Sequence, residues 1–116
     1  MNFAVSTVAF RGKSIEAVIE TAAKEKLTLE FSSGLPFRAD MEKVYLGAQA
    51  PRLLHNYFPA PENPFVLNLA SLNDEILEKS FRHCIQGLRL AASSQAPFFS
   101  AQAGFCVDPA SKELGA

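Results

Sequence analysis

The chain has 116 residues, of which 48% are hydrophobic and 20% are charged, and its formal net charge is −1. This composition is typical of one globular domain and excludes an intrinsically disordered chain. A net charge near zero supplies no long-range field to attract nucleic acid or an anionic membrane. No window holds the roughly 18 apolar residues of a membrane span, and the N-terminus lacks the features of a signal peptide. We therefore expect a cytoplasmic protein that binds neither nucleic acid nor a membrane.

The first half of the chain alternates apolar runs with helical patterns. Residues 3–10 are apolar and partly β-branched, which predicts a buried strand. Ser14 is suited to cap a helix, since apolar residues follow it at helical spacing: Ile15, Val18, Ile19, Ala22 and Ala23. Residues 27–31 alternate as in a second strand, residues 41–49 predict a short helix, and residues 53–55 predict a third strand.

The second half begins with a loop, because residues 59–64 contain three prolines. Ser71 and Asp74 fit a capping box that opens a long helix over residues 72–93. His83 is expected at its surface or boundary, whereas Cys84 is expected to be a small buried residue. The predicted inner face of this helix comprises Leu77, Phe81, Cys84, Ile85, Leu88, Ala91 and Ala92. Residues 98–102 predict a fourth strand.

Regular alternation of strands and helices predicts an α/β fold with a parallel sheet and right-handed crossovers. Two architectures fit: a small doubly wound sheet of four strands, or the N-terminal half of a (β/α)8 TIM barrel, about four βα units long. The loop after the first strand, residues 11–14, has a single glycine and forms no phosphate-binding fingerprint. A half-barrel would leave two unpaired sheet edges and an uncovered apolar inner face.

Polar side chains stand where the predicted strands end, and such strand ends carry the sites of parallel α/β proteins. Glu30, His55 and Gln102 hold these positions on strands two, three and four, and Asp108 lies a little beyond. A lone histidine at a strand end is more often structural than a ligand, and Glu30 could equally pair with a nearby cation. Gln102 can only form hydrogen bonds, because a neutral amide is a poor zinc ligand.

Several local runs together resemble one known family. They are His55–Phe58, Phe65–Ser71, Lys79–Ser80 and the strand end Ala103–Gly104, with Glu30 placed before the turn at residues 32–34. This pattern is similar to the xylose isomerase-like TIM-barrel superfamily. That group holds sugar phosphate isomerases and epimerases together with the endonuclease IV type of apurinic endonuclease. The resemblance covers nearly the whole chain and implies one partial barrel domain over residues 1–116.

The resemblance also implies a site. Glu30, His55 and Gln102 become candidate substrate-binding residues, and His55 a candidate ligand of a divalent cation, zinc or manganese. The family's histidine on strand four is replaced here by Gln102, and the family's remaining ligands come from strands five to eight. Because a catalytic metal needs about three protein ligands, the metal site implied for this chain is incomplete.

Three functions follow as expectations. The first is the N-terminal part of an isomerase or epimerase that acts on a sugar or sugar phosphate once the barrel is complete. The second is a degenerate, non-catalytic half-barrel that serves as an assembly or binding module. The third and weakest is a metal-dependent nuclease for abasic DNA, which the near-neutral charge disfavours. The expected partners are the sugar substrate and either a second copy of the chain or a C-terminal half.

Overall fold

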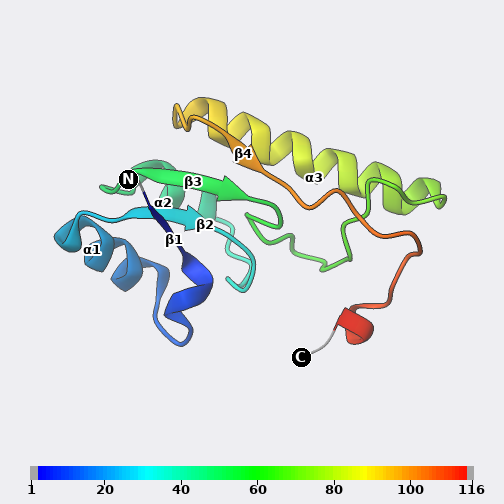
Figure 1. The fold of residues 1–116 in the computed structure, drawn as a ribbon, viewed down its shortest axis with the longest axis horizontal. Helices are drawn as coiled ribbons and strands as arrows, with labels where there is room; N and C mark the ends of the chain where they lie inside the picture. Colours follow the sequence, from blue (N-terminus) through cyan, green and yellow to red (C-terminus); the bar gives the residue numbers. More distant parts are fainter. Residues whose placement is uncertain (1–2, 115–116) are drawn as a thin grey trace.

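The computed structural model describes residues 3–114 of the chain (Figure 1). Its strands are β1 (Ala4–Ser6), β2 (Thr28–Phe31), β3 (Arg52–His55) and β4 (Phe99–Ser100). Its helices are α1 (Ile15–Glu25), α2 (Met41–Gly47) and α3 (Asp74–Ser93), with short 3-10 helices η1 (Thr7–Phe10) and η2 (Ser111–Leu114). No helix in this described range is both long enough and apolar enough to cross a membrane.

The four strands form one parallel sheet in the order β1-β2-β3-β4. A doubly wound sheet reverses its strand order at a switch point, whereas this order follows the chain without reversal. Because each right-handed crossover leads to the next strand in this order, all the helices lie on the same face of the sheet. Figure 1 shows α1 and α3 at opposite ends of this layer. The fold is therefore α/β with parallel strands, compatible with about four βα units of a half-barrel.

A single core lies between the sheet and its helices. Leu29 and Phe31 of β2 and Leu54 of β3 are fully buried in it. The Phe31 ring packs edge-on against Tyr45 of α2, with ring centroids 4.9 Å apart, and lies 5.1 Å from the ring of Phe58. Alternate strand residues thus supply the apolar surface that the helices cover.

The opposite face of the sheet is not covered by a helix. Strand alternation places Thr28 and Glu30 of β2 there, together with His55 of β3 and its β4 partner Ser100. These four residues are partly exposed. Leu53 of β3 is the large apolar side chain on this face, and it is buried. The expected apolar inner face is therefore wrong: the open face is mainly polar.

The first βα unit follows the sequence pattern except at the end of its strand. Ser14 caps α1 as predicted, because its Oγ accepts a hydrogen bond of 3.2 Å from the Ala17 amide. The predicted strand over residues 3–10 stops at Ser6, whose Oγ accepts from the Val8 amide at 3.3 Å. Thr7 then turns inward and its Oγ1 accepts from the Ser32 amide at 3.1 Å. Side-chain bonds therefore convert the end of this apolar run into η1.

The long helix begins later than the capping box predicts. Asn73 is the cap, and its Oδ1 accepts from the amides of Glu75 at 3.0 Å and Ile76 at 3.3 Å. The hydroxyl of Ser71 instead donates to the carboxylate of Asp108 at 2.7 Å. The predicted cap is therefore wrong: Ser71 Oγ accepts from the Asn73 amide at 3.0 Å, and not from an amide in the first turn of α3.

The buried face of α3 also differs from the prediction. Cys84 and Ala91 are buried as expected, but Phe81, Ile85 and Leu88 of the predicted inner face remain 53%, 43% and 53% exposed. His83, expected near the surface, is buried. The residues that α3 turns toward the protein are Ser80, His83, Cys84, Gly87, Leu90 and Ala91. The apolar face of α3 thus extends around more of the helix surface than the rest of the protein covers.

Candidate functional site

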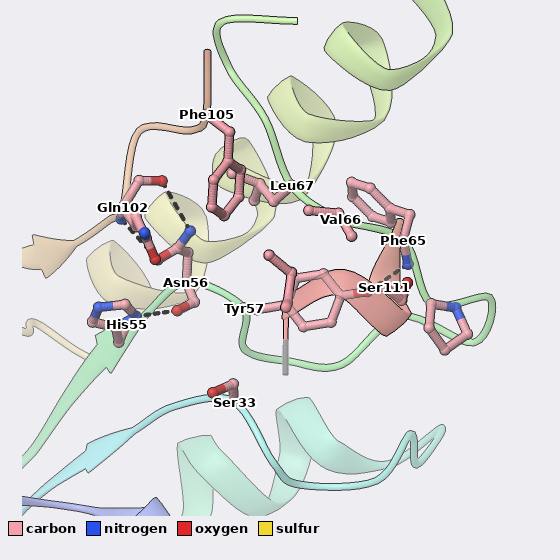
Figure 2. Close-up of a pocket in the computed structure, with 12 residues that line it drawn as sticks. Ser33, His55, Asn56, Tyr57, Phe65, Val66, Leu67, Gln102, Phe105 and Ser111 are labelled. Carbon is pink, nitrogen blue, oxygen red and sulfur yellow. Dashed lines mark hydrogen bonds between the residues drawn. The ribbon is translucent and has the colours of Figure 1, made fainter. Parts of the chain in front are cut away.

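A hollow of about 390 Å³ lies at the carboxyl ends of the strands (Figure 2). We define the hollow by its lining residues: Ser33, His55, Asn56, Tyr57, Pro64, Phe65, Val66, Leu67, Gln102, Phe105, Ser111 and Leu114. Its volume falls within the range of pockets that hold small molecules. Its position is where parallel α/β proteins place their ligands.

Asn56 joins the ends of β3 and β4 beside the hollow. Its Oδ1 accepts a hydrogen bond from the Gln102 amide at 3.0 Å, and its Nδ2 donates to the Gln102 carbonyl at 3.2 Å. Its own amide donates to the Ser100 carbonyl at 3.0 Å. Beyond Ser100, the Asn56 side chain thus takes the place of backbone hydrogen bonds between β3 and β4. This is why β4 ends before the predicted residue 102.

Three rings form an aromatic cluster behind the hollow. The ring of Tyr57 lies 5.6 Å from that of Phe65 and 4.9 Å from the imidazole of His83 on α3. The Tyr57 hydroxyl accepts a hydrogen bond of 2.8 Å from the Phe65 amide, and burial raises the Tyr57 pKa. Because this bond uses the hydroxyl as acceptor, its proton is still free to be donated to a ligand.

Asn68 ties the loop that lines the hollow to the segment after β4. It is almost fully buried, and its Oδ1 accepts from the amides of Ala70 and Phe105, each at 3.0 Å. Its Nδ2 donates to Asp108 Oδ1 at 2.7 Å. A Cβ on Gly104, whose φ is +149°, would lie 2.1 Å from Asn68 Oδ1. The close approach of the two segments therefore requires glycine at position 104.

The structure brings two of the three predicted site residues to the hollow. His55 ends β3 and lines the hollow, with Nδ1 in contact with the Asn56 carbonyl oxygen. Gln102 also lines it, and its side chain is exposed. Glu30 lies on the open face of the sheet, where its Oε2 accepts from Ser100 Oγ at 3.3 Å, and Ser33 lines the hollow at the end of β2 instead.

The chemistry of these donors does not fit a complete metal site. Within residues 3–114, no three His, Cys, Asp or Glu side chains approach closely enough to hold a metal ion. His55 offers one imidazole, Glu30 is engaged with Ser100, and the Asp108 carboxylate accepts from both Asn68 and Ser71. Since a catalytic metal needs about three protein ligands, this chain alone supplies too few.

The lining of the hollow suits an uncharged polar molecule with apolar faces. No Lys, Arg, Asp or Glu is among its lining residues. Gln102, Tyr57 and His55 offer donors and acceptors, while Phe65 and Phe105 offer flat apolar surface. A sugar ring has both properties, because its hydroxyls form hydrogen bonds and its C–H faces pack on aromatic rings.

Sequence reasoning missed Asn56 and Tyr57 as site residues, although both belong to the run that follows His55. The signal that could have identified them is the presence of polar side chains directly after a predicted strand. The contacts of Asn68 and Ser71 with Asp108 join residues 37–40 positions apart, and local patterns do not predict such contacts.

No protein-family model matches the chain, and no curated protein or solved structure matches it significantly. The likeness to the xylose isomerase-like superfamily therefore stays a prediction.

Proposed function

We propose that the chain is the N-terminal half of an isomerase- or epimerase-like barrel that binds a sugar or sugar phosphate in the hollow. The observation that carries this proposal is the hollow itself, which stands at the carboxyl ends of the strands with His55, Tyr57 and Gln102 in its lining. The unreversed strand order supports a barrel in preference to a doubly wound sheet.

In this proposal the chain supplies binding and orientation. Gln102 and the Tyr57 hydroxyl would bind sugar hydroxyls, and the Phe65 and Phe105 rings would pack on the face of the sugar ring. His55 is the lining residue whose imidazole can both accept and donate a proton. A phosphate group would bind elsewhere in the barrel, because barrels hold phosphate in the loops after strands seven and eight.

A divalent cation would polarise the substrate carbonyl in a complete enzyme of this type. The ligands of such a cation would have to come mainly from the missing half, since this chain contributes one imidazole at most. Turnover by the chain alone is therefore not expected, and binding is the property to test.

The test is a titration of the isotope-labelled chain with D-xylose, D-ribulose and D-ribulose 5-phosphate, followed by amide chemical shifts. We expect saturable shifts at Asn56, Tyr57 and Gln102 with a Kd of about 1–10 mM for at least one sugar. Gln102→Ala should weaken binding about fivefold, the effect of one lost hydrogen bond. Gln49→Ala, a matched change at an exposed position just after α2 and outside the lining of the hollow, should leave binding unchanged. Absence of saturable shifts with all three sugars would contradict the proposal.

The incomplete donor set favours a second candidate, a non-catalytic half-barrel that serves as an assembly or binding module. An experiment distinguishes the two candidates: the chain is mixed with the C-terminal half-barrel of an isomerase, and this half-barrel has no activity by itself. Isomerisation of D-xylose or D-ribulose 5-phosphate by the mixture supports the enzyme. A stable but inactive complex supports the module.

A further inference from the structure

His83 of α3 is a buried histidine with an orphaned ring nitrogen. The residue is 5% exposed, and its Nε2 has no hydrogen-bond partner within residues 3–114. Buried polar side-chain atoms are normally hydrogen-bonded, so this nitrogen is an exception. His83 does not line the hollow, and the proposed sugar binding gives it no direct part.

The imidazole of His83 stands behind one wall of the hollow, which we define as the rings of Tyr57 and Phe65. Both rings line the hollow (Figure 2). The imidazole lies 4.9 Å from the Tyr57 ring at an interplanar angle of 38°, and 6.1 Å from the Phe65 ring at 87°. The position of this wall therefore depends on a side chain that a ligand in the hollow would not touch.

The neutral imidazole is the form that fits this place. A neutral histidine carries one N–H, whereas the protonated ring carries two and a positive charge. In the protonated form, Nε2 would be a buried donor without an acceptor, on a ring whose charge is removed from water. Both effects are strongly unfavourable. Burial accordingly lowers the pKa of His83.

Neighbouring charges do not offset this cost. The charged groups of this part of the molecule come from three elements: Lys79 and Arg82 on α3, Glu62 on the loop after β3, and Glu42 on α2. The two cations pair with carboxylates of α3 itself. Glu62 is exposed, and Glu42 accepts a hydrogen bond from Gln86. Tyr57 is a neutral phenol whose pKa is raised by burial. None of these groups forms an ion pair with His83 in the described part of the chain.

We propose that His83 is a positioning residue for the hollow: its neutral imidazole holds the wall of Tyr57 and Phe65, and its protonation releases that wall and weakens ligand binding. The proposal rests on the proposed binding of a sugar in the hollow and adds a control by pH. To reach water, the protonated ring must leave its place behind Tyr57. The Tyr57 hydroxyl then loses the position from which it donates to a ligand. Binding is therefore complete above the pKa of folded His83 and is lost as the pH falls through it.

The first test needs no ligand. The chain has two tyrosines and two histidines, so NMR spectra of the chain labelled at both residue types resolve each ring. As the pH is lowered from neutrality, the Tyr57 ring signals should shift along the same curve as the His83 imidazole. Tyr45, which lies in the core and is hydrogen-bonded to Ser94, is the internal control and should not follow that curve.

Two variants assign the effect to one histidine. His83→Phe keeps a ring behind the wall but cannot be protonated, so the pH-dependent shift of Tyr57 should disappear. His55→Gln removes the other histidine, which lines the hollow itself, and the shift should remain. Far-UV circular dichroism at each pH verifies that the wild type and both variants are folded.

The second test adds the sugar that binds best in the titration described above. Its Kd should rise by up to about tenfold for each pH unit below the pKa of folded His83, because only the neutral form is competent to bind. This rise should be absent in His83→Phe and present in His55→Gln, whatever the absolute affinity of that variant.

Three outcomes would overturn the proposal. They are Tyr57 signals that do not follow the protonation of His83, a rise in Kd that persists in His83→Phe, and unfolding of the whole chain at the pH where His83 is protonated. Failure of every sugar to bind would count against the proposed function instead. The ring signals of the free chain would still decide whether His83 holds the wall.

Discussion

The two ends of the layer formed by the helices and the sheet are built differently. Around β2 and β3, Leu29, Phe31 and Leu54 are fully buried between helices and sheet. At the α3–β4 end, Phe81, Leu88 and Phe98 are more than half exposed. The same kind of residue thus stabilises the fold at one end and remains available for contact at the other. Hydrophobicity alone does not distinguish these two roles. The place of the neighbouring strand in the sheet, central or at the edge, does.

The sharpest test of this difference exchanges one phenylalanine at each end for alanine. Phe31→Ala removes the ring that contacts both Tyr45 and Phe58, and should lower the free energy of unfolding by about 3–5 kcal/mol. Phe81→Ala should change the stability of the monomer by less than about 0.5 kcal/mol, because its side chain is exposed. Urea unfolding of the two variants measures both. Equal losses would contradict the assignment of the two ends.

The second test concerns the polar link between the hollow and the segment after β4. Asn68→Ala removes the side chain that accepts from the amides of Ala70 and Phe105 and donates to Asp108. We expect a loss of about 1–3 kcal/mol in unfolding free energy, because a buried side chain loses three hydrogen bonds. Asn63→Ala, at an exposed loop position, is the matched control and should cost almost nothing. A small loss from Asn68→Ala would mean that the segment is not held in this way.

The third test probes the contact between α3 and β4. A Cβ at Gly87 would lie 2.7 Å from Cε2 of Phe99, so Gly87→Ala should move that ring. The overpacking cost of about 1–3 kcal/mol exceeds the gain of up to about 1 kcal/mol from the better helix propensity of alanine. Gly47→Ala in α2 meets no atom within 4 Å and should not destabilise the protein. Thermal unfolding of both variants measures the difference.

The smallest effect is expected from pH. Burial lowers the pKa of His83 from its ordinary value of 6.5, so the unfolded chain binds a proton more readily than the folded one. Stability should therefore fall as pH drops below about 6.5, toward the lower pKa of the folded state. His83→Phe keeps an aromatic ring beside Tyr57 and Phe65 and should flatten this dependence below about pH 6.5. An unchanged pH profile in the variant would exclude His83 as its source.

The sequence predicted the order of elements well because local rules govern them. Helix α1 begins at Ile15 after the Ser14 cap as expected, and the alternation of residues 28–31 gives the burial of β2 correctly. The strand ends placed His55 and Gln102 at one hollow, because parallel strands end at a common edge.

The errors arose where a distant residue competes with a local rule. Ser71 binds Asp108 and the Asn73 amide while Asn73 caps the helix, and the first strand ends at Ser6, where the next residue, Thr7, binds the Ser32 amide. The exposure of Phe81 depends on the absence of a helix beyond α3 among the described residues, which periodicity along one helix does not predict. Glu30 misses the hollow because its carboxylate meets Ser100 on the open face of the sheet.

The most direct measurement of the contrast between the two ends is amide hydrogen exchange of the dilute chain. We expect strong protection of the Leu29 amide, which donates to the Pro51 carbonyl at 2.9 Å inside the sheet. The Ser100 carbonyl accepts from the Asn56 amide of the β3 side, so the amides of Phe99 and Ala101 point away from β3 and should exchange fast. Strong protection of Phe99 and Ala101 would contradict an open edge at β4.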